Sequence, residues 1–392
     1  MHYLSAPGLA FNRCCIHPID WAFWLVVLWL CWIMLSTGAK ALTIILKIGE
    51  KVMQQIWIPK PGPPEVFEIR EVADPEPAAG EVRIRVEAAG INFADIMGRL
   101  GVYQDLPPMP VVVGYEVAGR VDQVGPDVSE ALLDADVLAL TRFGGYSDTV
   151  CVPAGQIMQR PGGMSAEVGA AIPVNYLTAF QLVRVMGGLR SGDTLLVHSA
   201  GGGVGIAATQ LALHLGAQVI GTASQRKHAF LMQLGVTHCI DYRQEDFEQR
   251  VQQITNGKGV ELVLDAVGGS SYKKSYRCLA ATGRLGMFGV SSAATHKTKN
   301  RWSYLKMAAS MPWLQFNPVS LINHNRGVFG VNLGRLWNEM ERVQCWLDEL
   351  LKLYSQGVVQ PVIAKTFSFA EVGSAHHYIQ DRQNIGKVLL KP

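Results

Sequence analysis

A glycine-rich turn between two regular elements constrains the fold of this chain more than any other feature. Residues 197–205 read Val-His-Ser-Ala-Gly-Gly-Gly-Val-Gly, between an apolar run, Thr194 to His198, and a helix-like stretch, Ile206 to Gly216. Small residues let the backbone approach a pyrophosphate, and the helix N-terminus offers unpaired amides to that anion. A purely structural turn is the alternative. The residues predicted to bind the pyrophosphate of a dinucleotide are Ala200, Gly202, Gly203, Val204 and Gly205.

The end of the second strand indicates which dinucleotide is bound. Sites for NAD place an acidic residue there, against the ribose 2′-hydroxyl. Residues 221–227 instead read Gly-Thr-Ala-Ser-Gln-Arg-Lys, without an acid. Ser224, Arg226 and Lys227 would suit a 2′-phosphate, although Arg226 and Lys227 could also be solvated residues of a first helical turn. The sequence therefore favours NADPH.

Strand-like and helix-like stretches alternate from about residue 175 to residue 335. The expected strands lie at 194–198, 217–222, 239–242, 261–265 and 284–290, and the expected helices include 206–216 and 226–235. This order is typical of right-handed βαβ units around a parallel sheet. Before it, the alternation Val82-Arg-Ile-Arg-Val86 and many prolines indicate a compact β-barrel-like domain. Residues 358–392 look strand-like again, with one short helix near Glu371, and are expected to rejoin that first domain.

Bulk composition narrows the classes of protein and partner. A chain of 392 residues suits two domains, and 49% hydrophobic against 17% charged residues indicates a large core. The net charge is +3 without a long basic run, so no nucleic-acid partner is expected. The seven cysteines are dispersed and form no C-x-x-C pair, which favours a reduced, cytoplasmic protein without a structural zinc site.

The first 52 residues form a separate leader with two open interpretations. Trp21 to Leu35 is continuously apolar, and no charge occurs between Asp20 and Lys40. Residues 21–39 are thus close to the ~20 residues that a transmembrane helix needs, and would anchor a cytoplasmic body. Alternatively, translation begins at Met53, which opens a strand-like segment.

Several stretches outside the glycine turn resemble one known family. They are Ala89-Gly-Ile-Asn-Phe-Ala-Asp95, Gly101-Val-Tyr-Gln-Asp-Leu-Pro-Pro-Met-Pro110, Val174-Asn-Tyr-Leu-Thr-Ala179, Gly235-Val-Thr-His238, Ile240-Asp-Tyr242 and Asn384-Ile-Gly-Lys-Val-Leu-Leu390. From about Met53 to the C-terminus, the chain resembles the zinc-free quinone oxidoreductases (zeta-crystallin-like) of the medium-chain dehydrogenase/reductase superfamily. It looks most similar to the branch of the synaptic vesicle membrane proteins.

The resemblance implies a fold and a domain order. It is an α/β fold in which a GroES-like β-barrel catalytic domain is combined with a Rossmann domain, a doubly wound parallel sheet. The leader (1–52) would precede a catalytic domain (53–174), an NADP-binding Rossmann domain (175–335) and a C-terminal part (336–392) with a helix and the return to the catalytic domain. It also implies a homodimer formed along an edge of the Rossmann sheet.

The resemblance also implies roles for individual residues. Asn92, Asp95 and Tyr103 would be catalytic, with Asn92 and Asp95 lining the cleft for nicotinamide and substrate, and Tyr103 at its mouth. Besides the glycine turn, the expected cofactor contacts are Thr178, Ser224, Lys227, Tyr242, Phe288, Gly289, Val290 and Asn384. Met97 stands where many bacterial quinone reductases carry a second tyrosine, so any role of that tyrosine is lost.

No metal site is expected. Zinc-dependent relatives use a cysteine near the position of Asn92 and a Gly-His-Glu triplet, where this chain has Gly114-Tyr115-Glu116. A catalytic zinc needs three nitrogen, sulfur or carboxylate ligands, and these are not supplied. His198 is interpreted as a strand residue, and His376 and His377 as core or surface histidines whose side chains diverge on a helix.

These observations predict an NADPH-dependent oxidoreductase that transfers hydride to a quinone or an α,β-unsaturated carbonyl compound. In it, Asn92 and Tyr103 would bind the acceptor oxygen and water would complete protonation. Asn92 as a turn residue and Tyr103 as a packed loop aromatic are the alternatives for these two positions. The alternative function is a membrane-associated nucleotide- or lipid-binding protein with little catalysis, to which the apolar stretch Trp302–Ile322 would contribute. A packed dimer interface or a covering of the substrate cleft is preferred for that stretch.

Overall fold

The computed structural model describes residues 51–294, 302, 305, 309 and 316–392. Residues Met53–Pro392 form one compact unit. The predicted transmembrane segment, residues 21–39, lies outside the described residues. Within those residues, none of the helices combines the length and the apolar character that a bilayer crossing requires.

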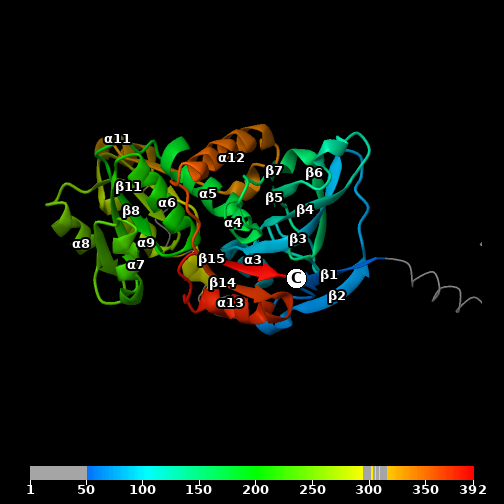
Figure 1. Ribbon diagram of the computed structural model, residues 1–392. Coiled ribbons are helices and arrows are strands. Elements are labelled where there is room, and N and C mark those ends of the chain that lie inside the picture. Colours follow the sequence, from blue (N-terminus) through cyan, green and yellow to red (C-terminus); the bar gives the residue numbers. More distant parts are fainter. Residues whose placement is uncertain (1–50, 295–301, 303–304, 306–308, 310–315) are drawn as a thin grey trace, which may run out of the picture. The chain divides into compact units, whose positions relative to one another are not determined.

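A six-stranded, fully parallel sheet forms the centre of the nucleotide-binding half (Figure 1). Its strands are β8 (Thr194–His198), β9 (Gln218–Ala223), β10 (His238–Asp241), β11 (Val260–Asp265), β12 (Leu279–Met287) and β13 (Gly327–Gly330). They lie side by side in the order β10-β9-β8-β11-β12-β13. Numbered from β8, this is the order 3-2-1-4-5-6 of the Rossmann fold, with the switch between β8 and β11, where such sheets bind ligands.

Helices connect these strands on both faces of the sheet. They are α6 (Gly203–His214), α7 (His228–Gln233), α8 (Phe247–Ile254), α9 (Ser270–Arg277) and α11 (Pro318–His324). Leu195 and Val197 of β8 are fully buried on one face, and Leu196 is fully buried on the other. Burial on both faces explains why β8 reads as a continuous apolar run.

A second, mostly antiparallel sheet forms the other half. Its strands are β3 (Glu81–Ile91), β4 (Glu116–Val124), β5 (Asp136–Leu140), β6 (Thr149–Pro153), β7 (Ile157–Gln159), β14 (Ile363–Ser368) and β15 (Lys387–Lys391). The order is β14-β15-β3-β4-β5-β7, and β6 also pairs with β3. The strands β1 (Val52–Trp57) and β2 (Glu68–Ala73) form a separate pair.

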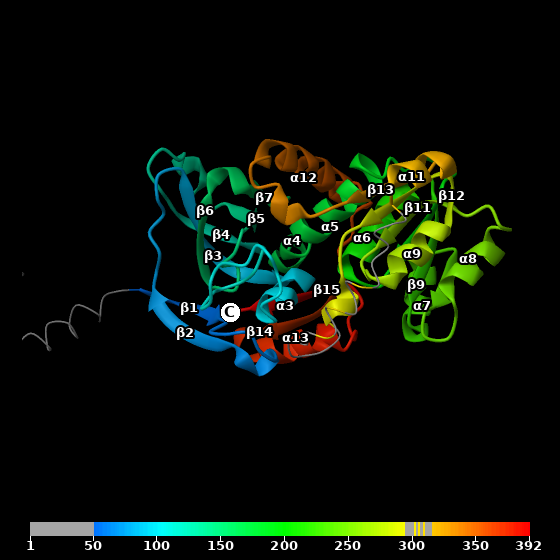
Figure 2. The same ribbon diagram turned by 180° about the vertical axis from the view of Figure 1, so that it is seen from behind.

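Five α-helices accompany the second sheet. They are α3 (Phe93–Arg99), α4 (Ala166–Ala170), α5 (Pro173–Phe180), α12 (Met340–Ser355) and α13 (Val372–Gln380). A π-helical turn, Gln181–Val185, continues α5. Short 3₁₀ turns lie at Pro64–Val66, Glu130–Leu132, Ala154–Gln156, Gln225–Lys227, Ser291–Ala294, Leu333–Arg335 and Phe369–Glu371. Both views show α12 lying next to α5, away from α13 (Figures 1 and 2).

The C-terminal segment joins the two halves. Strand β15 pairs antiparallel with β3, so the last strand of the chain completes the sheet that the first half began. Just before β15, Gly386 N donates a hydrogen bond of 3.0 Å to Gly201 O, and Gly386 forms a parallel bridge with Gly202. The C-terminal end of the second sheet is therefore bonded to the glycine turn.

The α/β class with a GroES-like and a Rossmann part is confirmed. The expected strand 194–198 coincides with β8, and 217–222, 239–242 and 261–265 lie within a residue or two of β9, β10 and β11. The strand expected at 284–290 was predicted too late in the chain, because β12 begins at Leu279 and ends at Met287. The domain boundaries after residues 174 and 335 remain predictions.

Candidate active site

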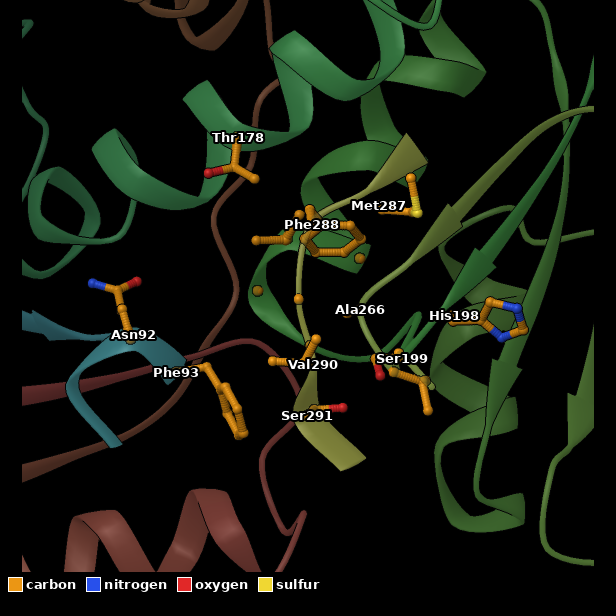
Figure 3. Close-up of a pocket in the computed structure, with 18 of the residues that line it drawn as sticks. Asn92, Phe93, Thr178, His198, Ser199, Ala266, Met287, Phe288, Val290 and Ser291 are labelled. Atoms are coloured by element: carbon orange, nitrogen blue, oxygen red, sulfur yellow. The ribbon is translucent and has the colours of Figure 1, made fainter. Parts of the chain in front are cut away.

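A cavity of about 1690 Å³ lies where the two sheets and the C-terminal segment meet. Figure 3 shows Thr178 on α5, Asn92 at the start of α3 and Phe288 after β12 around one hollow. Of the residues predicted to form the site, the cavity is lined by Asn92, Tyr103, Thr178, Gly202, Gly203, Val204, Gly205, Ser224, Lys227, Tyr242, Phe288, Gly289, Val290 and Asn384. Asp95 and Ala200 do not line it.

The glycine turn connects β8 to α6 as the sequence predicts. The left-handed residue of the turn is Ser199 (φ 57°) rather than a glycine. The glycines serve close approach instead: a Cβ on Gly205 would lie 2.5 Å from Ser199 O, and a Cβ on Gly203 would lie 2.1 Å from the Asn175 side chain. No side chain caps the start of α6, so its first amides are free to face an anion.

Ala200 supports the turn from below. Its side chain is fully buried, and a Cβ on Gly221 of β9 would lie only 2.9 Å from it. The Ala200 side chain packs between the turn and β9, and a contact of Ala200 with the cofactor remains a prediction. A small residue is still required there.

Lys227, Tyr242 and Arg382 line one end of the cavity, and Arg226 and Arg243 lie close to them. Arg382 donates a hydrogen bond of 3.0 Å to Tyr242 Oη, and the Arg243 guanidinium lies 5.9 Å from the Tyr242 ring centroid. Lys227 Nζ donates to the Asn384 carbonyl, and the Arg226 guanidinium to the Arg382 carbonyl. This arrangement suits an anion with more than one negative charge.

The electrostatics of this end follow from that crowding. Burial, followed by repulsion from Arg226, Arg382 and Arg243, lowers the pKa of Lys227 to about 8. Burial tends to raise the pKa of Tyr242, but Arg382 and Arg243 outweigh it and lower that pKa. The contributions of the arginines to both shifts indicate positive charge that a phosphate would neutralise.

The acid at the end of β10 does not reverse this conclusion. Asp241 is 4% exposed, and its carboxylate accepts hydrogen bonds from the amides of Gln225 (3.3 Å) and Arg243 (3.0 Å). It therefore organises the neighbouring turns and is not presented to a ribose at the end of β9.

The opposite end of the cavity is mainly apolar. Phe93, Met97, Leu140 and Val174 line it together with Tyr103 and Tyr115. The segment after β12 is fixed beside the end of β11, because Phe288 N donates to Asp265 O (3.1 Å) and Tyr272 Oη donates to Gly289 O (2.7 Å). A flat, uncharged ring system fits such walls.

Asp95, predicted to be catalytic, does not line the cavity, and its catalytic role remains a prediction. It is fully buried beneath α3, where its carboxylate accepts hydrogen bonds from Asn92 N (2.7 Å), Gly114 N (3.2 Å) and Tyr146 Oη (3.1 Å). Burial raises its pKa to about 7, against the lowering by these hydrogen bonds and Lys387. Asp95 thus caps the helix that begins after Asn92.

Asn92 is held by a buried ion pair that the sequence did not reveal. Lys387 Nζ donates to Asn92 Oδ1 (2.6 Å) and to Glu116 Oε1, while Asn92 Nδ2 donates to the same Glu116 oxygen (2.9 Å). Glu116 Oε2 accepts from Val174 N (2.7 Å). The Lys387 and Glu116 side chains are 3% and 0% exposed, so the pair is dry and the Asn92 amide has one orientation.

A zinc ion does not fit these residues. The ammonium of Lys387 fills the space between Asn92 and Glu116, and Tyr115 offers a phenol in place of an imidazole. In the part of the chain that the structure describes, His, Cys, Asp and Glu side chains form no group of three or more that could hold a metal.

A second buried polar network lies behind the glycine turn. His198, the last residue of β8, approaches Thr222 Oγ1 (2.9 Å) and Ser275 Oγ (3.0 Å), and Ser275 donates to Asp265 (2.7 Å). Burial lowers the pKa of His198, against attraction from Asp265. The histidine is thus a strand residue with satisfied partners, as predicted. His376 is fully buried and His377 contacts Glu65, so these two side chains diverge as expected.

The residues that sequence reasoning missed are long-range partners. Arg243 and Arg382 flank residues that were predicted, Tyr242 and Asn384, so their proximity in sequence was an available signal. Lys387 and Glu116 lie 271 positions apart, and only their membership in two quoted motifs could have drawn attention to them.

Comparison with known proteins places these features in a family. Residues 203–349 match the family model described as zinc-binding dehydrogenase, and residues 78–162 match the alcohol dehydrogenase GroES-like domain. The synaptic vesicle membrane protein VAT-1 homolog of Rattus norvegicus is 41% identical over 82% of this chain and 80% of its own length. The 2-haloacrylate reductase of a Burkholderia species is 32% identical over 86% and 98%. The crystal structure of Escherichia coli quinone oxidoreductase complexed with NADPH is 30% identical, covers 86% of this chain and 100% of its own, and superposes with a TM-score of 0.76.

Proposed function

This chain belongs to the medium-chain dehydrogenase/reductase superfamily, in the branch of the VAT-1 homologs, and on that premise we propose that it is an NADPH-dependent, zinc-independent reductase of quinones or α,β-unsaturated carbonyl compounds. The observation that carries the proposal is a cavity with Lys227 and Arg382 beside Tyr242 at one end and mainly aromatic and apolar walls at the other. The similarity to a quinone oxidoreductase complexed with NADPH and to a 2-haloacrylate reductase supports it.

The residues present fit NADPH in their chemistry. Ser224, Lys227 and Tyr242 would hold the 2′-phosphate, joined by Arg243 and Arg382. The amides at the start of α6 would bind the pyrophosphate. The turn that presents them has no room for a side chain at Gly203, beside Asn175, or at Gly205, beside Ser199 and Ala200. When bound, NADPH supplies a hydride to the acceptor.

The remaining contacts position the reacting rings. Thr178, Phe288, Gly289 and Val290 would enclose the nicotinamide, and Asn384 would contact the cofactor through the C-terminal segment. Asn92 presents an amide that Lys387 and Glu116 already orient, so we assign it the placement of the rings rather than proton donation. Positioning of this kind can supply much of the rate enhancement when no Lewis acid assists.

The experiment is a turnover screen with both reduced nicotinamides. We expect oxidation of NADPH, followed by its absorbance, with quinones and enones, and much slower oxidation of NADH. Simple alcohols with NADP⁺ should give no turnover, because no metal polarises the hydroxyl. Turnover of alcohols alone, or absence of NADPH binding in calorimetry, would refute the proposal.

A group of exposed apolar side chains supports the alternative function, a membrane-associated binding protein. Trp302 (79%), Leu305 (61%), Val319 (66%) and Ile322 (73%) are exposed, and the relatives are named synaptic vesicle membrane proteins. The predicted stretch 302–322 lies partly outside the described residues. Flotation of a protein beginning at Met53 with liposomes tests it: co-flotation without NADPH turnover would favour a binding protein over a reductase.

A homodimer remains part of the proposal. Strand β13 ends the strand order of the parallel sheet, so one of its edges has no partner strand among the described residues. Pairing of this edge with a second copy would protect it. Light scattering of the purified protein should give twice the mass of one chain.

A further inference from the structure

Asn175 carries a buried side-chain amide for which the described residues provide no hydrogen-bond partner. The residue lies in the first turn of α5 and is only 6% exposed, yet it lines the cavity. Its amide oxygen and nitrogen make no hydrogen bond with any described residue, and both atoms keep accessible surface. Buried polar atoms almost always have partners, so an unpaired amide that borders a ligand cavity indicates that the ligand supplies the partner.

This amide lies against the start of α6, at the glycine turn. A Cβ on Gly203, the first residue of α6, would lie 2.1 Å from Asn175 Nδ2 and 3.0 Å from Asn175 Oδ1, so the nitrogen is the nearer atom. The stem of Lys227 lies against the same turn at Gly201, where a Cβ would be 2.8 Å from Lys227 Cδ. The uncapped start of α6 therefore has an amide and a lysine side chain as direct neighbours.

Hydrogen bonds on both sides fix the position of Asn175. Immediately before it, Val174 N donates to Glu116 Oε2 of the buried ion pair (2.7 Å). Immediately after it, Tyr176 Oη donates to Gln210 Oε1 of α6 (2.7 Å). Because α5 is bonded to the second sheet and to α6, the Asn175 amide is held beside the glycine turn before any ligand binds.

A packing role alone does not call for this residue type. Leu177, Ala179 and Phe180 of the same helix are apolar and buried. An apolar side chain of similar size would fill the space against Gly203 without leaving a buried amide unpaired. Asparagine is also a weaker helix former than leucine or alanine. The property that distinguishes asparagine here is its ability to donate and accept hydrogen bonds.

We propose that the Asn175 amide binds the cofactor, with Nδ2 donating a hydrogen bond to a pyrophosphate oxygen of the dinucleotide at the start of α6. This inference rests on the proposed function and deepens it, because it adds a neutral donor from α5 to the backbone amides of the turn. NADPH and NADH share the pyrophosphate, so Asn175 contributes affinity for both without distinguishing between them. Lys227 and Arg382, which face the 2′-phosphate in the proposed function, serve the choice of cofactor instead.

The test compares Asn175→Ala and Asn175→Asp with the parent and with Asn323→Ala, a matched control. Asn323 is an exposed asparagine of α11 that does not line the cavity. Calorimetry gives the affinity of the full chain for NADP⁺ and for NAD⁺, and thermal melting without nucleotide reports on the fold. NADPH turnover with 1,4-naphthoquinone is measured in parallel. Asn175→Asp keeps the size of the side chain, removes the Nδ2 donor and adds a negative charge.

We expect Asn175→Ala to weaken the binding of both nucleotides by the same factor, about 10- to 100-fold, the range of one hydrogen bond to a charged group. Asn175→Asp should bind both more weakly than Asn175→Ala, because its carboxylate repels the pyrophosphate. Its melting temperature should nevertheless be unchanged or higher, since a negative charge is favourable at the start of a helix. A side chain that only packs would give the opposite order of affinities, because aspartate keeps the shape of asparagine. Asn323→Ala should match the parent.

Three results would overturn the proposal. One is an Asn175→Ala variant with parental affinity for both nucleotides. Another is an Asn175→Asp variant that binds as well as Asn175→Ala or better, which would make Asn175 a packing residue. The third is a loss confined to NADP⁺, which would place the amide at the 2′-phosphate. Failure of the proposed function is distinguishable, since a parent that binds nucleotide but reduces no acceptor refutes the reductase and leaves the binding comparison intact. A parent that binds neither nucleotide refutes both.

Discussion

At one end of the cavity, Lys227 and Arg382 lie beside Tyr242, with Arg226 and Arg243 close to them, whereas at the other end the cation Lys387 is buried and already paired with Glu116. The first group carries a net positive charge, so an anionic ligand would supply its counter-ion. The second group is neutral as a whole, so it would orient a ligand without needing a counter-ion from it. The difference teaches that the same residue types select a ligand in one place and hold a scaffold in the other.

The largest effect is expected where both ends meet, at the glycine turn. Gly205→Ala should abolish measurable binding of NADPH and NADH in calorimetry, because its Cβ would lie 2.5 Å from Ser199 O and 2.6 Å from Ala200 O. Gly162→Ala is the matched control, since a Cβ there meets nothing within 4 Å. Parental affinity in Gly205→Ala would contradict the turn as the pyrophosphate site.

The scaffold role of Lys387 predicts a large loss of stability. Lys387→Met leaves the fully buried Glu116 carboxylate without its cation, which should lower the free energy of unfolding by about 3–5 kcal/mol in urea titration. Lys391→Met, which breaks the more exposed pair with Glu167, should cost less than about 1 kcal/mol. Adding Glu116→Gln to Lys387→Met should recover part of the loss. Equal costs for the two lysines would show that Lys387 is not a scaffold cation.

The cationic end of the cavity is proposed to select NADPH over NADH, which predicts a change in affinity for NADPH alone. Arg382→Ala should weaken NADPH binding about 10- to 100-fold, because a charge-assisted hydrogen bond to the 2′-phosphate is lost. NADH binding should stay within about threefold of the parent, since NADH lacks that phosphate. Arg120→Ala, in an exposed pair with Asp134, is the control. An equal loss for both nucleotides would mean that Arg382 supports the fold and not the choice of cofactor.

The smallest effect is a dependence of cofactor choice on pH. The pKa of Lys227 in the free protein is lowered to about 8, so its ammonium is present below pH 8 and is lost as the pH rises through that value. The ratio of NADPH to NADH affinity should therefore fall between about pH 7 and pH 9, by at most tenfold per pH unit for one proton. In Lys227→Met this slope should vanish. A ratio that stays constant in the parent would place the 2′-phosphate away from Lys227.

The nucleotide-binding half could be predicted because its determinants are local. The apolar run of β8, the glycine turn and the absence of an acid after Thr222 lie within one stretch of the chain, and each has a direct physical meaning. The strands β9 to β11 followed from their apolar runs. The start of β12 was misplaced because Ala280 to Gly283 carry small residues without a β-pattern.

The acceptor end could be predicted only in part. Asn92 and Tyr103 line the cavity, but Asp95, three residues after Asn92, turned out to be a buried cap. Position in a motif does not say on which side of a short helix a side chain lies. The sequence did not predict the contact of Lys387 with Glu116. This contact depends on β15 and β4 both pairing with β3, which only the folded sheet brings about.

The six residues from Arg382 to Lys387 have a consequence for redesign. Arg382 contacts Tyr242, Asn384 accepts from Lys227, Gly386 is bonded to Gly201, and Lys387 orients Asn92. With a dinucleotide bound as we propose, these residues would act as a common spacer between its two ends. An engineer who changes the coenzyme preference by altering one end of this six-residue segment should expect to shift the register at the other, so the two properties will have to be evolved together.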